Sequence, residues 1–238
     1  MNEIHFSIII PVYNEQDNIF ELYNQISVSD CYKFCKEIVF INDHSNDNTD
    51  KNINLLMKKD PKIIYLENDI NKGQSFSILT GVKKSSCDII VTLDGDLQNN
   101  PDDIINLYNE FIINDYKLIG GIRKKRKDNL IKVLSSKIAN VIRRYILSDN
   151  CNDTGCSLKI FDKKIFLSIP YFNGMHRFIP AFYSGFGYKT KFINVDHRKR
   201  INGKSKYGTL KRLFNGILDI YKVKKYLKEY KKKDKNIK

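Results

Sequence analysis

Short runs of β-branched and other apolar residues alternate along this chain with segments of helical periodicity. The runs are FSIII (6–10), EIVFI (37–41), KIIYL (62–66), DIIVTL (88–93) and KLIGGI (117–122). Between the first two, DNIFELYNQI (17–26) places Ile19, Leu22, Tyr23 and Ile26 on one helix face. Buried strands joined by helices form a parallel sheet. The alternation therefore predicts an α/β fold with a mainly parallel central sheet flanked by helices.

Segments rich in polar side chains lie at the ends of three of the predicted strands. The first strand runs into Pro11, Tyr13, Asn14 and Glu15, the second into Asn42, Asp43, His44 and Ser45, and the fourth into Asp94, Gly95, Asp96 and Gln98. The carboxyl ends of parallel strands meet at one edge of a sheet, where α/β proteins bind ligands. The sequence thus predicts an acidic ligand site at that edge.

The stretch TLDGDLQNNPDDI (92–104) combines two patterns. A helix start explains Asn99 to Asp103, because Pro101 suits the first helical turn and acidic residues favour it. Capping does not explain Asp94 and Asp96, which flank a glycine before the cap begins. Two carboxylates at this spacing can hold Mg²⁺ or Mn²⁺ together with a diphosphate. Alone, such a pair is a weak signal.

Positive charge is concentrated in two segments of a chain whose formal net charge is +14. Residues 123–144 contain nine Lys or Arg against one acid, and residues 222–238 contain nine against two. Such segments attract phosphate in nucleic acid, anionic lipid or a phosphorylated substrate, although a solvated face and a flexible tail also fit them. Residues 123–147 show an amphipathic helix pattern rather than base-stacking aromatics, so a nucleic-acid-binding module is a remote alternative.

Several other classes find little support in the sequence. The segment NGKS (202–205) resembles the end of a phosphate-binding P-loop, but the required first glycine is Arg198, and a GxGxxG motif is absent. The N-terminus lacks a typical secretory signal, and no apolar run approaches the roughly 18 residues of a spanning helix. Five cysteines without CxxC spacing indicate reduced thiols. We therefore expect a soluble or peripheral protein.

Taken together, the motifs identify a family resemblance over residues 6 to about 220. SIIIPVYNE, INDHSNDNT, NKGQSFSILTG, DIIVTLDGDLQNNPDDI and GIRKKR occur in the order and spacing of family 2 glycosyltransferases with the GT-A fold. DTGCSLKIF, GMHRFIP and HRKRINGKSKYG resemble the dolichol-phosphate mannose synthase branch, especially its bacterial polyprenyl-phosphate glycosyltransferases. Asn42, His44 and Ser157 depart from this pattern, since Asp, Gly and Gly are commoner there.

The resemblance implies roles for individual residues. Donor-binding residues would be Pro11, Tyr13, Glu15, Ile41, Asp43, Lys72, Asp94 and Gly95. Asp94, Asp96 and Gln98 would hold Mg²⁺ or Mn²⁺. Asp96, Arg123, Arg200 and Lys206 would serve catalysis, and Arg126, Ser136, His176 and Arg177 would bind the acceptor.

The reaction that this resemblance implies is inverting transfer of a sugar from a nucleotide sugar to a polyprenyl (undecaprenyl or dolichyl) phosphate. The alternative is a family 2 enzyme acting on a glycan or other non-lipid acceptor in cell-envelope polysaccharide synthesis; a binding module or inactive homologue is a third reading. We expect a GT-A domain over residues 1–208 and a basic extension over 209–238. We also expect a cytoplasmic protein, peripherally bound to the inner face of the membrane and able to form homo-oligomers.

The C-terminal extension has its own pattern. Its apolar residues recur at helical spacing with lysines between them: Leu213, Phe214, Ile217, Leu218, Tyr221, Tyr226, Leu227 and Tyr230. A basic amphipathic helix of this type can lie on an anionic membrane surface. It can equally pack its apolar side on the domain and leave a lysine-rich tail in solvent. The sequence leaves both alternatives open.

Overall fold

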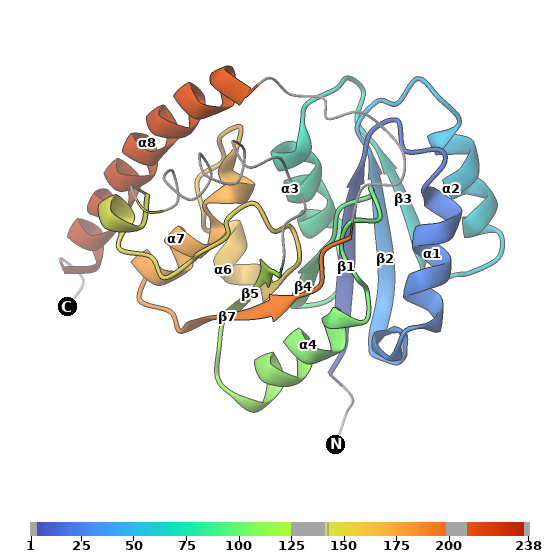
Figure 1. The fold of residues 1–238 in the computed structure, drawn as a ribbon, viewed down its shortest axis with the longest axis horizontal. Helices are drawn as coiled ribbons and strands as arrows, with labels where there is room; N and C mark the ends of the chain where they lie inside the picture. Colours follow the sequence, from blue (N-terminus) through green and yellow to red (C-terminus); the bar gives the residue numbers. More distant parts are fainter. Residues whose placement is uncertain (1–3, 125–140, 142, 199–208, 236–238) are drawn as a thin grey trace.

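The computed structural model describes residues 4–124, 141, 143–198 and 209–235 of the 238-residue chain. Its strands are β1 (Phe6–Val12), β2 (Cys35–Asn42), β3 (Ile63–Glu67), β4 (Ile89–Thr92), β5 (Leu118–Arg123), β6 (Lys159–Asp162) and β7 (Thr190–Val195). Its helices are α1 (Ile19–Val28), α2 (Thr49–Met57), α3 (Gln74–Lys84), α4 (Asp103–Ile113), α6 (Lys163–Leu167), α7 (Ile179–Gly185) and α8 (Thr209–Lys235), with 3₁₀ turns η1 (Asp30–Lys33) and η2 (Met175–Arg177). Figure 1 shows helices on both sides of the sheet.

All strands of the described residues belong to one sheet, in the order β3-β2-β1-β4-β6-β5-β7. β1 pairs in parallel with β2 and β4, β2 with β3, and β5 with β7, whereas β6 runs antiparallel between β4 and β5. The five strands predicted from apolar runs are confirmed, and the sheet is mainly parallel as expected. β6 and β7 were not predicted, because β6 is short and carries a lysine and β7 has no continuous apolar run.

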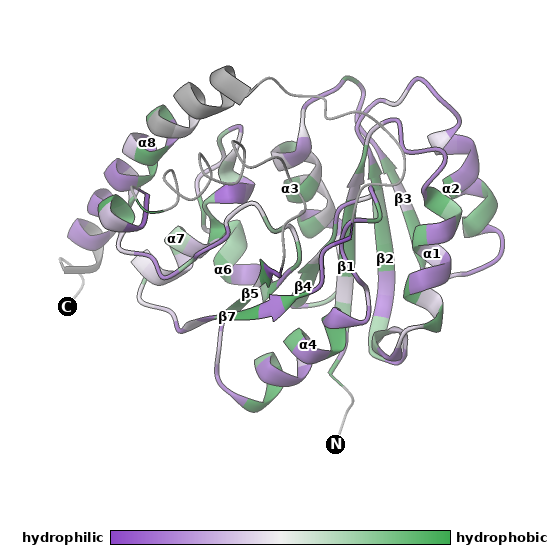
Figure 2. Ribbon diagram, viewed as in Figure 1, coloured by the Kyte–Doolittle hydropathy of each residue, from purple (hydrophilic) through white to green (hydrophobic). Residues whose placement is uncertain are grey.

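Successive strand residues face opposite sides of the sheet, and this alternation builds two cores. Ile8 and Ile10 of β1 pack with α1, α2 and α4, while Ile9 packs with α3, α6, α7 and α8. The strands are hydrophobic over much of their length (Figure 2), as expected for a sheet covered on both faces. The predicted apolar face of α1 is confirmed for Ile19, Leu22 and Ile26, which are fully buried.

Helix α8 packs part of its apolar side on the second core. Ile220, Val223 and Leu227 are buried there, and the Tyr230 ring lies 4.1 Å from that of Phe186. Leu218 and Tyr221 remain 47% and 62% exposed. Figures 1 and 2 show α8 at the end of the molecule opposite α1 and α2, with hydrophilic and hydrophobic residues alternating along it. Within the described part of the chain, none of the helices combines the length and apolarity needed to cross a bilayer.

Two smaller sequence predictions can be compared with the fold. Helix α4 begins at Asp103 rather than at Pro101, which lies in the preceding turn, so the proline ends the loop instead of opening the helix. All five cysteines are free and buried. Burial raises the pKa of Cys31 and of Cys156 to about 11, which keeps these thiols protonated and unreactive at neutral pH.

Candidate active site

The carboxyl ends of β1, β2 and β4 meet at one edge of the sheet, as the sequence predicts. The Asp43 amide donates to the Val12 carbonyl at 2.8 Å, which ties the end of β2 to the end of β1. The loop after β4 also packs directly against the end of β1, because a Cβ added to Gly95 would stand 2.8 Å from the Val12 side chain. Glycine is therefore required between Asp94 and Asp96 for this loop to pack on β1.

Asp43 organises the loop that precedes α3. Its carboxylate is 5% exposed and accepts hydrogen bonds from the Asn68 side chain and from the backbone amides of Lys72 and Gly73, at 2.7, 2.9 and 2.8 Å. The neighbouring His44 has a φ of 63°, a conformation that glycine adopts without strain. This explains why glycine is commoner there in the family that the sequence resembles.

Asp94 is held from the opposite side by the first residue of α3. The Gln74 amide donates to the Asp94 carboxylate at 2.8 Å. Burial, together with repulsion from the Asp96 carboxylate, raises the pKa of Asp94 to about 6. A hydrogen bond from Ser157 and the positive charges of Lys159 and Arg123 act in the other direction. Two carboxylates are thus held close together in a site that water reaches poorly.

Asp96 and Gln98 lie in a tight turn. Asp96 is 6% exposed and accepts a hydrogen bond from the Gln98 amide at 3.2 Å, and Leu97 between them has a φ of 61°. The Gln98 side chain donates to the Arg198 carbonyl at 3.3 Å, and the Arg198 amide donates back to the Gln98 carbonyl at 2.9 Å. The turn is therefore tied to the segment that follows β7.

The chemistry of this donor set fits a divalent cation. Mg²⁺ in phosphate-transfer sites is held by one or two protein carboxylates plus substrate phosphates rather than by a complete protein cage. Asp94 and Asp96 supply two such carboxylates, and a cation would relieve the repulsion between them. No group of three or more His, Cys, Asp and Glu side chains suited to a metal occurs in the described ranges. The substrate would have to complete the coordination.

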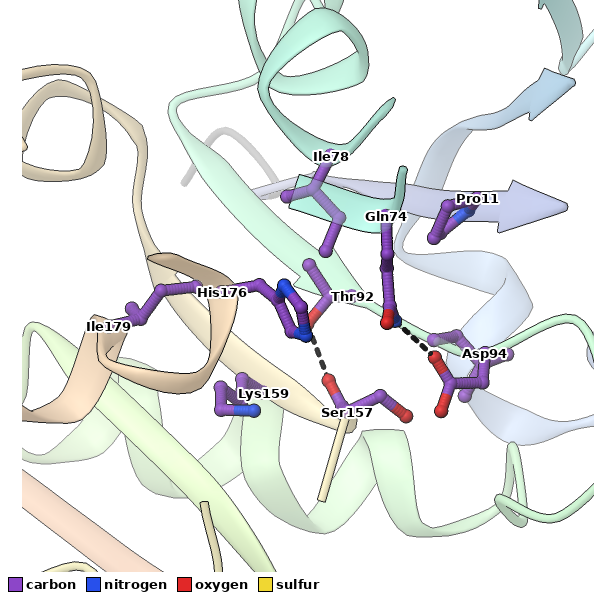
Figure 3. Close-up of a pocket in the computed structure, with 10 residues that line it drawn as sticks. Pro11, Gln74, Ile78, Thr92, Asp94, Ser157, Lys159, His176 and Ile179 are labelled. Atoms are coloured by element: carbon purple, nitrogen blue, oxygen red, sulfur yellow. Dashed lines mark hydrogen bonds between the residues drawn. The ribbon is translucent and has the colours of Figure 1, made fainter. Parts of the chain in front are cut away.

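A small pocket adjoins Asp94 on the α3 side of the sheet (Figure 3). Its lining residues come from distant parts of the sequence: Pro11, Gln74, Ile78, Thr92, Leu93, Asp94, Ser157, Lys159, His176 and Ile179. The Ser75 hydroxyl accepts from the Gly174 amide at 2.9 Å and lies 2.6 Å from the His176 Nδ1. These contacts fix η2 against α3 and turn the His176 ring towards Ser157 (Figure 3).

The two predicted arginines that the structure describes are both paired with aspartates. Arg123 forms a two-pronged ion pair with Asp153, both nitrogen–oxygen distances being 2.7 Å, and its own backbone amide donates to the same carboxylate at 3.2 Å. Arg177 donates to Asp219 of α8 at 2.9 Å. Asp153 and Asp219 are nearly buried, so each arginine is held in a defined place.

The remaining predicted residues lie in different settings. Pro11 lines the pocket, the Ile41 side chain is fully buried under α3, and the Lys72 ammonium lies 2.5 Å from Asp69 and over the Phe76 ring. The Glu15 carboxylate accepts from Asn18 at 2.6 Å, just beyond Tyr13 at the end of β1. Four predicted residues lie outside the described residues: Arg126, Ser136, Arg200 and Lys206.

Sequence reasoning did not single out three side chains that help to build this site. Gln74 and Ser75 were within the motif NKGQSFSILTG, but no spacing rule assigned them a partner. Lys159 was a lysine inside the apolar segment SLKIF, and a charge in such a segment is itself the signal that could have identified it.

Comparisons with known proteins show the family to which this chain belongs. The sequence profile of Glycosyl transferase family 2 matches residues 7–169. The chain is 31% identical over 230 residues to the dodecaprenyl-phosphate galacturonate synthase of Rhizobium johnstonii, covering 94% of this chain and 67% of that protein. It is 34% identical over 220 residues to the undecaprenyl-phosphate 4-deoxy-4-formamido-L-arabinose transferase of Pectobacterium atrosepticum, covering 90% and 65%. The chain thus spans about two thirds of the length of these relatives.

Solved structures confirm the fold. The crystal structure of glucosyl-3-phosphoglycerate synthase from Mycobacterium tuberculosis, in complex with Mn²⁺, uridine diphosphate and phosphoglyceric acid, aligns with a TM-score of 0.70. The alignment covers 91% of this chain and 78% of that one at 15% identity, so the likeness concerns the fold alone. The predicted GT-A type of α/β fold is correct.

Proposed function

The chain belongs to glycosyltransferase family 2, and we propose that it transfers a sugar from a nucleotide-sugar donor to a polyprenyl phosphate. The observation that carries this proposal is the convergence of Asp43, Asp94 and Asp96 at the edge where β1, β2 and β4 end. The proposed acceptor is based on the two relatives described above, both of which are named as enzymes that act on a polyprenyl phosphate. Their names specify different sugars, so the sugar is a separate question.

The donor would lie along this edge with its diphosphate at the paired carboxylates. Asp94 and Asp96 would hold Mg²⁺ or Mn²⁺, which would neutralise negative charge on the nucleoside diphosphate as it departs. Similar folds bind uridine diphosphate together with Mn²⁺ or Mg²⁺ in glucosyl-3-phosphoglycerate synthase, which supports this cofactor assignment. The loop anchored by Asp43 forms the neighbouring wall, where the nucleoside would bind.

The reaction would be an inverting displacement at the anomeric carbon of the sugar. A phosphate acceptor is already anionic, so its oxygen can attack without a strong general base. The main catalytic tasks are then to position the two substrates and to stabilise the departing diphosphate. Arg123, oriented by Asp153, would face those phosphates, and Arg200 and Lys206 would close over them. Arg126, Ser136, His176 and Arg177 remain the proposed acceptor-binding residues.

A lipid acceptor requires the enzyme to work at a membrane surface. We propose that the chain binds the inner face of the membrane peripherally through α8. The buried Ile220, Val223 and Leu227 fix the helix on the domain, while Tyr221, Leu218 and several lysines remain exposed. A helix that is anchored on one side and basic on the other can approach anionic lipid headgroups.

A transfer assay with labelled nucleotide sugars tests the proposal. The acceptors to compare are polyprenyl phosphate, the free polyprenol and a panel of glycans, each with and without Mg²⁺. Transfer to the polyprenyl phosphate alone is the expected result. Transfer to a glycan hydroxyl but not to polyprenyl phosphate would show that the acceptor is not a lipid phosphate. A protein that binds nucleotide sugars without transferring them would be an inactive homologue.

A further inference from the structure

Lys159 is a buried cation beside the end of β4. It is 4% exposed, and in β6 it stands opposite Thr92 of β4. Its ammonium donates to the Cys156 carbonyl, and no direct ion pair joins it to an acidic side chain within the described ranges. Because a buried charge loses its hydration, the nearest carboxylate has a strong influence on it.

The strand register makes Asp94 that nearest carboxylate. β6 runs antiparallel to β4 and pairs Lys159 with Thr92, and Asp94 follows Thr92 by two residues. Residues two apart on a strand face the same side, and diagonal neighbours across a strand pair lie about 7–8 Å apart, within reach of a long side chain. Lys159, Thr92 and Asp94 all line the small pocket of Figure 3. Lys159 and Asp94 are therefore electrostatic neighbours.

The positive charge of Lys159 acts on the Asp94 carboxylate. Burial and repulsion from Asp96 raise the pKa of Asp94 to about 6, and the charge of Lys159 opposes this rise. Arg123 opposes it too, but the Asp153 carboxylate accepts two hydrogen bonds from that guanidinium at 2.7 Å, which balances its charge. Lys159 is thus the cation whose charge is directed mainly at Asp94.

This arrangement sets the charge of the carboxylate pair. Asp94 and Asp96 supply two negative charges, and Lys159 cancels one of them. A divalent cation at the pair would meet one net negative charge instead of two and would be repelled by the ammonium. Since the place is poorly hydrated, water screens this repulsion only weakly.

We infer, on the basis of the metal assignment in the proposed function, that Lys159 is a built-in counter-ion of Asp94 that weakens the binding of a divalent cation by the protein alone. Lys159 acts through Asp94 and is a positioning residue rather than a catalytic one. Without its ammonium, the two carboxylates bind such a cation more tightly. The sign of this effect is distinctive, because general damage to the site weakens metal binding instead.

Titration with Mn²⁺, followed by the electron paramagnetic resonance of the free ion, tests this inference without nucleotide. It is performed at about pH 8, where protons compete little for the carboxylates. Lys159→Met should bind Mn²⁺ about 10-fold or more tightly than the wild type. Lys159→Arg keeps the charge and should stay within about twofold of the wild type. The control variant Lys83→Met, which removes an exposed lysine of α3, should leave the affinity unchanged.

Unchanged or weaker Mn²⁺ binding by Lys159→Met overturns the inference. If circular dichroism shows that this variant does not fold, Lys159→Gln takes its place, with the same expected and the same contrary result. Binding of UDP and of GDP at saturating Mn²⁺ is measured on the wild type in parallel. If neither nucleotide binds, the proposed function fails, while the Mn²⁺ titrations of the variants still decide the role of Lys159.

Discussion

The Arg177 guanidinium donates to the Asp219 carboxylate at 2.9 Å and thereby joins η2 to the C-terminal helix α8. Asp219 is 5% exposed, and Gly174, two residues before His176, lies so close that an added Cβ would stand 2.7 Å from Arg177. On its other side the same turn is held to α3 through Ser75. The turn that carries His176 to the pocket beside Asp94 is thus fixed between α3 and α8.

The two ion pairs of Asp219, with Arg177 and with Lys222, should contribute differently to the free energy of unfolding. Asp219→Ala should lower the free energy of unfolding by about 1–2 kcal/mol, because it removes the ion pair with Arg177 and empties a buried position. The estimate stays at this level because Arg177 is 32% exposed and water partly screens the pair. Lys222 lies 3.5 Å from the same carboxylate but is 57% exposed, so Lys222→Ala should change stability by less than about 0.5 kcal/mol. Urea unfolding measures both, and equal effects would contradict the prediction.

Removal of the Asp96 carboxylate should strongly lower metal-supported activity. Asp96→Ala should lower turnover by about two orders of magnitude or more, because the diphosphate then lacks its charge stabilisation. The matched control is Asp102→Ala, which removes an exposed acid six residues further on. Turnover and Mg²⁺ binding by calorimetry, with circular dichroism to verify folding, check the prediction. Full activity of the wild type in excess chelator would falsify it.

The cluster of Asp60 with Tyr23 and Tyr32 should make stability depend on pH in the acid range. Burial raises the pKa of Asp60, but hydrogen bonds from Tyr32, the Lys62 amide and Tyr23 outweigh this effect, so the pKa is lowered overall. A lowered pKa means that the stabilisation is present above the unfolded-state value of about 3.9 and disappears as the pH falls through the folded-state value. Asp60→Asn should therefore be less stable than the wild type at pH 7, and the difference should shrink as the pH is lowered below about 4. Denaturant unfolding at several pH values measures it; a difference that does not vary with pH contradicts the assignment.

The exposed lysines of α8 should determine membrane binding. Truncation of this helix would also remove the buried Val223 and Leu227, so substitution is the sharper experiment. Replacing Lys224, Lys225 and Lys228 by Gln should weaken binding to anionic vesicles by about 100-fold at low salt, since each base near the surface contributes about 1 kcal/mol. The control is the replacement of Lys51, Lys58 and Lys59 by Gln, on and just after α2 at the other side of the sheet. Vesicle flotation measures the binding. If both triple variants float equally well, α8 is not the contact with the membrane.

Much of the fold and part of the site could be predicted from the sequence because the signals are local. Each of the five predicted strands is a continuous apolar run, and a parallel sheet brings Asp43, Asp94 and Asp96 to one edge whatever the details of packing. β6 gave no such signal. It is four residues long, carries Lys159 and enters the sheet antiparallel between β4 and β5, the two strands that precede it along the chain.

Periodicity and motif spacing along the chain are sufficient to give the alternation of strands and helices, the family and the acidic edge. Tertiary structure decided which of these residues meet. Contacts between Ser75 and His176, between Arg177 and Asp219, and around Lys159 join positions about 40 to 100 residues apart. Their partners depend on how helices from both halves of the chain pack on one face of the sheet, and no local propensity encodes that packing.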